Sequence, residues 1–114
     1  MPKALAIGPK IQSTTERAYK AGVNIAFGSD AGVFPHGKNA KEFIYMNEAG
    51  IPIIECLQAA TIVNAKILSM ETEIGQIEKD FIADLVATKL NPEDDISALE
   101  NIVFVMKEGV IYKN

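Results

Sequence analysis

The sequence predicts an α/β fold that closes with a small β unit. The residue pattern up to about residue 68 predicts a helix, a strand, a loop and further helices, which is the element order of α/β proteins. After Met70 the apolar residues occur in short or alternating runs, which are typical of strands. With 114 residues, of which 48% are hydrophobic, the chain is sufficient for one domain or a piece of one.

The first helix is predicted over residues 9–21. Its apolar and small residues share one stripe, and Gly22 follows at the position where helices commonly end in a left-handed residue. The mostly apolar residues 23–28 then predict a buried strand. A loop over residues 31–38 comes after the strand, and such loops often carry functional residues.

Three further helices are predicted next. Asn39 is expected to cap a helix that runs to residue 48 or 49, and Gly50 is expected to end it. Pro52 suits the first turn of the following helix, which extends to about residue 60. Thr61 then begins a helix that continues to about residue 68.

Short strands are predicted for the remainder of the chain. A two-residue hairpin is indicated by Glu108-Gly109, because these residues lie between two apolar runs. Asn91-Pro92 is expected to end an earlier strand. The apolar runs include Ile74, Ile77 and Ile82 and cover residues 85–90, 102–106 and 110–112.

Composition excludes several classes of function. The net charge of -4 argues against a nucleic-acid surface. A membrane helix needs about 20 consecutive apolar residues, and every apolar run in the sequence is much shorter. The amino terminus also has no apolar core of a signal peptide, so a cytoplasmic location is expected. The single cysteine, Cys56, fits a reducing compartment and is expected to be an inert core residue on the apolar face of its helix.

Asp30 is the candidate active-site residue that the pattern singles out. It follows the predicted strand directly, where α/β proteins place their chemistry, and small residues after it leave the carboxylate uncovered. A carboxylate can bind a divalent cation and can also carry a proton. The alternative is that Asp30 caps a helix or a turn, and spacing alone leaves both interpretations open.

Four separated segments together resemble the carboxy-terminal third of metal-dependent amidohydrolases. Their order and spacing match that superfamily over nearly the whole chain, most closely in the imidazolonepropionase-like and Xaa-Pro dipeptidase (prolidase-like) branch. The segments are Gly28-Ser29-Asp30-Ala31-Gly32, Ala59-Ala60-Thr61 with Ala65, Ile74-Gly75-Gln76-Ile77-Glu78 and Ala83-Asp84-Leu85-Val86.

The resemblance implies the carboxy-terminal fragment of a (β/α)8 TIM-barrel hydrolase plus part of a small β-sandwich. Residues 1–70 would form the last barrel units and residues 71–114 the carboxy-terminal sandwich strands. In such enzymes one or two divalent metals, commonly zinc, activate a water that attacks an amide or related bond. Asp30 matches the position that binds metal and accepts the proton of that water, and His36 resembles a substrate-contacting position. Alternatively, His36 is an exposed loop histidine without a functional role.

The chain also departs from the family pattern. It has one histidine, whereas the family uses a His-x-His pair, a bridging lysine or glutamate and two later histidines. Because a catalytic zinc needs about three protein ligands, we expect an incomplete site and no hydrolase activity from this chain alone. Two smaller departures are Ser69, where relatives often have glycine, and Lys79-Asp80, where many have Pro-Gly.

Three hypotheses about function follow. The chain supplies Asp30 and part of the pocket for a small amide or dipeptide substrate, in a site completed by the missing amino-terminal part of the enzyme. Alternatively it is a non-catalytic α/β remnant that self-associates through the open edges of its barrel strand. The third hypothesis is a different enzyme, in which Asp30 pairs with Glu42 or Glu48 as two carboxylates.

Overall fold

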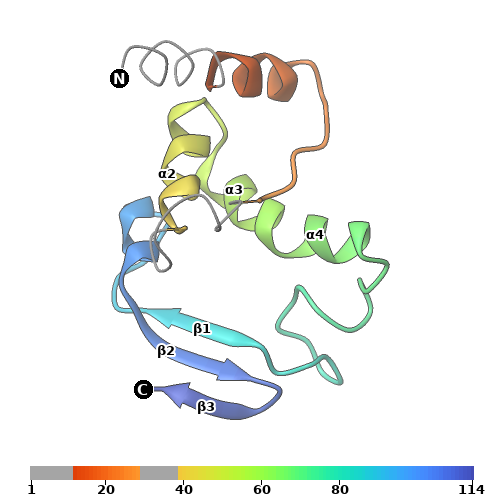
Figure 1. Cartoon of the computed structure of the whole chain (residues 1–114), viewed down its shortest axis with the longest axis vertical. Coiled ribbons are helices and arrows are strands. Elements are labelled where there is room, and N and C mark those ends of the chain that lie inside the picture. The colour runs from red at the N-terminus through yellow and green to blue at the C-terminus, as the bar shows by residue number, and fades with distance from the viewer. Residues whose placement is uncertain (1–11, 29–38) are drawn as a thin grey trace.

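A group of helices lies above a small antiparallel sheet in the computed structural model, which describes residues 12–28 and 39–114 (Figure 1). The α/β class predicted from the sequence is confirmed for this part of the chain. A helix over residues 12–20 comes first, and we call it the amino-terminal helix. The other elements are α2 (Lys41–Glu48), α3 (Ile53–Ala60), α4 (Ile62–Ile67), β1 (Leu85–Thr88), the 3-10 helix η1 (Ile96–Glu100), β2 (Ile102–Lys107) and β3 (Val110–Lys113).

The amino-terminal helix ends as its glycine predicts. Gly22 has a φ of +85°, and its N–H donates to the carbonyl of Tyr19 at 3.0 Å. The N–H of Val23 donates to the carbonyl of Ala18 at 3.1 Å. These two bonds form a Schellman motif, which satisfies carbonyls that the helix end would leave free.

The prediction of a strand over residues 23–28 is wrong for the structure observed, because these residues join no sheet. A β-ladder needs a neighbouring strand, and the three strands in the described part of the chain pair with one another instead. Burial nevertheless alternates along these residues, as it would in a strand. Ile25 and Phe27 are half-buried and pack against the core, whereas Asn24 and Ala26 are exposed.

Helix α2 ends at the predicted place but begins differently. Gly50, at a φ of +103°, follows its last turn, and the N–H of Ile51 donates to the carbonyl of Met46 at 3.3 Å. The expected capping by Asn39 is wrong, because the cap residue is Ala40 and no side chain caps the helix. Asn39 contributes its backbone carbonyl instead, which accepts from the N–H of Glu42 at 3.2 Å.

Helices α3 and α4 follow in quick succession, as the sequence predicts. Pro52 is the cap residue of α3, and Thr61 lies between the two helices. Thr61 is no side-chain cap for α4, because its hydroxyl donates back to the carbonyl of Leu57 at 2.8 Å. Helix α4 ends at Ile67, one residue earlier than expected.

The core lies between the helices and η1. Ile51 and Cys56 are its most completely buried side chains. Cys56 therefore occupies the core position expected from the sequence. The cluster unites residues from distant parts of the chain, which are Met46, Ile51, Cys56, Ala59 and Ile96, with Tyr19, Ile25, Phe27, Phe43, Ile44, Ile53 and Leu99 packed around them.

The carboxy-terminal strands form a three-stranded antiparallel sheet in the order β1-β2-β3. The predicted hairpin at Glu108-Gly109 is confirmed, with both residues at positive φ of 49° and 81°, as a type I′ turn requires. The residues from Ile74 to Ile82 form turns rather than strands. These residues have no strand partner in the described part of the chain, so periodicity alone misleads there.

Ser69 occupies a glycine-like position at the end of α4. Its φ is +57°, and the N–H of Met70 donates to the carbonyl of Ala65 at 2.8 Å, in the Schellman arrangement seen at Gly22 and Gly50. Because a left-handed conformation costs a residue with a Cβ about 1–2 kcal/mol, we expect Ser69→Gly to stabilise the chain by about 0.5–1 kcal/mol. Urea unfolding measures this change, and Ser97→Gly is the control, since Ser97 does not have a positive φ. A destabilising Ser69→Gly would contradict the prediction.

Candidate functional site

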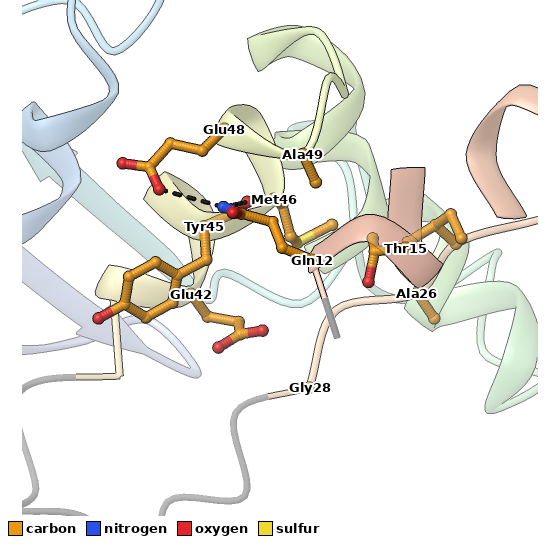
Figure 2. A pocket seen from close by; sticks show the side chains of 10 residues that line it. Gln12, Thr15, Ala26, Gly28, Glu42, Tyr45, Met46, Glu48 and Ala49 are labelled. Atoms are coloured by element: carbon orange, nitrogen blue, oxygen red, sulfur yellow. Dashed lines mark hydrogen bonds between the residues drawn. The ribbon is translucent and has the colours of Figure 1, made fainter. Parts of the chain in front are cut away.

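A pocket of about 490 Å³ opens between the amino-terminal helix, residues 25–28 and α2 (Figure 2). Both polar and apolar side chains face it. Gly28 lies at its border, and Asp30 follows Gly28 by two positions in the sequence. The lining residues are Gln12, Thr15, Ile25, Ala26, Gly28, Glu42, Tyr45, Met46, Glu48 and Ala49.

Gln12 joins the two helices across this pocket. Its Nε2 donates to Oε2 of Glu48 at 3.1 Å and to the backbone carbonyl of Tyr45 at 3.4 Å, as the dashed lines in Figure 2 show. The Glu48 carboxylate is therefore engaged in holding the amino-terminal helix against α2.

Glu42 is the other acidic residue of the pocket. Partial burial raises the pKa of its carboxyl above the ordinary value, because desolvation disfavours the charged form. The structure thus brings Glu42 and Glu48, the two alternative partners of Asp30 in the third hypothesis, to one pocket. Their pairing with Asp30 stays a prediction, because Asp30 lies outside the described residues.

Phe27 anchors the segment that leads toward Asp30. Its N–H donates to the carbonyl of Ala59 at the end of α3, at 3.1 Å. Its carbonyl accepts from Nδ2 of Asn64 in α4, also at 3.1 Å. Its ring stacks on that of Phe43 with 4.3 Å between the centroids and 22° between the planes. The segment is thereby fixed to α2, α3 and α4.

Two of the four family-like segments meet at the start of α4. Ala65 is buried, and a Cβ built on Gly75 would lie only 2.9 Å from the Ala65 Cβ and 3.0 Å from the carbonyl oxygen of Thr61. The alanine and the glycine thus permit a close approach between α4 and the following turn. Asp84 also has a structural contact, because its Oδ1 accepts from the N–H of Glu108 in the hairpin at 2.9 Å.

The two site residues predicted from the sequence, Asp30 and His36, both lie outside the described residues. Asn64 was not singled out from the sequence, although it contacts the Phe27 carbonyl. The available signal was a polar residue within the apolar run of α4, but such residues are commonly exposed. Only the position of the Phe27 carbonyl identifies its role.

The described residues do not form a metal centre by themselves. Within residues 12–28 and 39–114, no three histidine, cysteine, aspartate or glutamate side chains gather closely enough to hold a metal ion. The same part of the chain contains no helix with the length and apolar character needed to cross a membrane.

Cys56 is protected from reaction by its surroundings. Burial, with the nearby Glu55 as a smaller cause, raises the pKa of its thiol from an ordinary 9.0 to about 11. Its Sγ lies 3.5 Å from the carbonyl of Ile51. The thiolate is the reactive form of cysteine, so this geometry suits packing rather than chemistry.

The raised pKa predicts a loss of stability in alkali. The folded chain holds the proton more tightly than the unfolded chain, so the contribution of Cys56 is complete below about pH 9 and is lost as the pH rises toward 11. We expect the difference in unfolding free energy between the original chain and Cys56→Ala to shrink over this window. Urea unfolding at pH 7, 9, 10 and 11 measures it. A difference that does not vary with pH would contradict the prediction.

Comparison with known proteins gives a family and several relatives. The Amidohydrolase family matches residues 3–113. A 5-methylthioadenosine/S-adenosylhomocysteine deaminase of Caldanaerobacter subterraneus subsp. tengcongensis is 35% identical over 100 residues, which cover 74% of this chain and 23% of that protein. Ochratoxinase of Aspergillus niger is 35% identical over 103 residues, which cover 84% of this chain and 21% of that protein.

A solved structure resembles the chain over almost its full length. It is that of a Xaa-Pro dipeptidase with bound methionine in the active site, 50% identical with a TM-score of 0.93, and the match covers 99% of this chain and 28% of that one. The chain therefore spans less than a third of this structure and less than a quarter of the two relatives above.

Proposed function

Because the chain belongs to the amidohydrolase family, we propose that it supplies the Asp30-bearing part of a hydrolase that cleaves amide or peptide-type C–N bonds. The observation that carries the proposal is the 50% identity and 0.93 TM-score with a Xaa-Pro dipeptidase. This similarity favours a dipeptide substrate. Acyl-amino acids and cyclic amides are the other members of the proposed substrate class.

Asp30 has two roles in this proposal. It contributes one carboxylate ligand to a divalent metal, commonly zinc in such enzymes, and it accepts a proton from the attacking water. His36 contacts the substrate. The segment before Asp30 supports these roles, because the backbone of Phe27 is held at both its N–H and its carbonyl, three positions upstream.

The proposed architecture places this chain within a larger enzyme. Residues 1–70 would contribute the last units of a (β/α)8 barrel and residues 71–114 the carboxy-terminal strands of a β-sandwich. The backbone groups of Asn24, Ile25 and Ala26 have no hydrogen-bond partner among the residues that the structure describes. Neighbouring barrel strands from the rest of the enzyme would satisfy them.

The chain alone is proposed to be inactive. The described residues hold no cluster of three metal-binding side chains, and a catalytic zinc needs about three protein ligands. The remaining ligands would come from the amino-terminal part of the enzyme.

A self-associating module without catalysis is the second candidate. It is favoured by large apolar side chains that are exposed in this chain, and by the backbone groups of residues 24–26, which lack a partner within residues 12–28 and 39–114. Examples on the sheet and the turn before it are Ile77, Val86 and Tyr112, whose exposed fractions are 90%, 62% and 69%. Such surfaces are usually covered in an assembly.

A hybrid enzyme tests the proposed function. In it, the 114-residue chain replaces the matched segment of the Xaa-Pro dipeptidase. We expect the hybrid to hydrolyse a dipeptide that ends in proline, to lose this activity on chelation and to regain it with zinc. The chain alone is assayed in parallel and should show no turnover. Size-exclusion chromatography with light scattering reports its oligomeric state.

The outcomes separate the candidates. An active hybrid together with an inactive chain supports the hydrolase proposal. A folded but inactive hybrid, together with a stable oligomer of the chain alone, favours the self-associating module. Turnover by the chain alone would contradict the proposal that its site is incomplete.

A further inference from the structure

The pocket between the amino-terminal helix and α2 has no role in the proposed function, yet its lining indicates a kind of ligand. Its volume of about 490 Å³ lies within the range of about 300–1,000 Å³ that small-molecule sites occupy. Its apolar lining residues are Ile25, Ala26, Met46 and Ala49. Its polar side chains are those of Gln12, Thr15, Glu42, Tyr45 and Glu48. Such a lining is typical of sites for molecules with an apolar body and a few polar groups.

The charged groups of this lining are all acidic. Glu42 and Glu48 contribute carboxylates, and no lysine, arginine or histidine is among the described residues that line the pocket. The chain as a whole has a net charge of -4, which also attracts cations. The pocket is therefore complementary to a positively charged ligand and disfavours an anion.

The two carboxylates differ in their partners. Glu48 accepts a hydrogen bond from Gln12 at 3.1 Å, whereas the carboxylate of Glu42 has no hydrogen bond or ion pair with any residue within 12–28 or 39–114. Glu42 is half-buried, so water solvates its charge incompletely. Figure 2 shows this carboxylate extending from α2 into the space between Tyr45 and Gly28. A cationic group in that space would supply the missing electrostatic partner.

This arrangement favours an organic cation over a metal ion. Within the described ranges, Glu42 belongs to no group of three histidine, cysteine, aspartate or glutamate side chains that could hold a metal. An ammonium group needs only hydrogen-bond acceptors, which one carboxylate and neutral oxygens can provide. The side-chain carbonyl of Gln12 and the hydroxyl of Tyr45 are acceptors on the same lining.

We propose that this pocket binds a small primary amine that carries an apolar group. Its ammonium donates to the Glu42 carboxylate, and its apolar group packs against Ile25, Met46 and Ala49. Burial of the apolar group contributes affinity, whereas the ammonium determines selectivity, because hydrogen bonds between charged groups are stronger than neutral ones. The inference concerns described residues only and does not rest on the proposed function.

Titration of the 114-residue chain with phenethylamine, followed by NMR of the backbone amides, tests the proposal. The probe is protonated at neutral pH, and with about nine heavy atoms it should bind with a Kd on the order of 1 mM. The amide signals of Ala26, Gly28, Glu42 and Met46 should shift. 2-Phenylethanol, which is neutral and of similar shape, should bind at least about tenfold more weakly, and phenylacetate more weakly still. Equal binding of the amine and the alcohol, or shifts that spare these residues, would overturn the proposal.

Glu42→Gln and Glu78→Gln form a matched pair of variants. Each removes one negative charge, but Glu78 is exposed and does not line the pocket. Glu42→Gln should weaken phenethylamine binding at least about tenfold, and Glu78→Gln less than about twofold. Because Glu42→Gln removes a charge that burial disfavours, the variant should fold at least as stably as the original chain, which urea unfolding checks. Equal affinities of the two variants would contradict the role of Glu42.

Ala26→Leu tests the apolar part of the pocket while keeping Glu42. Ala26 is exposed and lines the pocket, so the larger side chain takes space from the ligand without entering the core. We expect it to weaken phenethylamine binding about tenfold, the effect that a change of one or two methylene groups has in an apolar site. Unchanged affinity in Ala26→Leu would show that the amine binds elsewhere.

The hybrid enzyme tests the pocket in the assembled protein. Its Kd for phenethylamine should lie within about threefold of that of the chain alone, whether or not the hybrid hydrolyses dipeptides. An inactive hybrid that binds the amine would therefore contradict the proposed function and leave this inference supported. Loss of binding in a folded hybrid would show that the rest of the enzyme fills the pocket, which would overturn the assignment of a small-molecule ligand.

Discussion

Replacing Asp30 by asparagine in the hybrid enzyme should lower kcat about 10²- to 10⁴-fold. Asparagine has nearly the same size, but it cannot accept a proton at neutral pH and is a weaker ligand for a hard or borderline cation. General base catalysis alone contributes a factor of this magnitude. Initial rates with a proline-terminated dipeptide at saturating concentration measure the effect.

Asp84→Asn is the matched control for this substitution. Its Oδ1 accepts from the N–H of Glu108, and an asparagine oxygen can accept the same bond. The control should therefore keep kcat within about threefold of the original hybrid. A loss of less than about tenfold in Asp30→Asn, or similar losses in both variants, would show that Asp30 has no catalytic role.

Replacing Gly75 by alanine should destabilise the chain by about 2–5 kcal/mol. Two costs add up at this position. Its φ is +93°, where a Cβ is strained by about 1–2 kcal/mol. The Cβ would also lie 2.9 Å from the Cβ of Ala65 and 3.0 Å from the Thr61 oxygen, and overpacking of this kind costs about 1–3 kcal/mol. Backbone atoms are among the neighbours, so relief requires the turn to move away from α4.

Gly109→Ala is the control that separates the cost of backbone strain from the cost of overpacking. Gly109 has a comparable φ of +81°, but no atom lies within 4 Å of the position its Cβ would take. This control should lose only about 1 kcal/mol or slightly more, through the backbone alone. Urea unfolding of both variants measures the difference. Equal destabilisation would contradict the close contact of Gly75 with α4.

Local signals in the sequence predicted most element ends correctly. Gly22 and Gly50 end their helices because a left-handed residue completes each helix terminus, and glycine adopts that conformation without strain. Glu108-Gly109 forms the expected hairpin between β2 and β3. These predictions succeed because the physical cause lies within a few residues of the signal.

Predictions that depended on distant partners did less well. Residues 23–28 have the alternation of a strand, yet a ladder needs a second strand that the described chain does not provide. The residues from Ile74 to Ile82 have strand-like apolar spacing but form turns. One local prediction also failed, because the side chain of Asn39, a good capping residue by type, does not cap α2.

The same distinction applies to the candidate site, where some residues were predicted from the sequence and other contacts were found only in the structure. Asp30 and His36 were singled out from sequence and resemblance, and their roles stay proposals, whereas the family is shown by the match over residues 3–113. The two peptide contacts of Phe27 with Ala59 and Asn64 were invisible in the sequence. They join positions 32 and 37 residues apart, and no local rule connects such positions.

The sequence by itself determined the α/β class, the helix ends at Gly22 and Gly50, the hairpin and the family to which the chain belongs. Each of these follows from short-range backbone preferences or from the order of residue types along the chain. Only the tertiary structure decided which residues meet: Phe27 with Asn64, Gly75 with Ala65, and Glu42 with Glu48 in one pocket. The reason is that close packing and buried hydrogen bonds select partners by position in space, and that position is fixed by the whole fold.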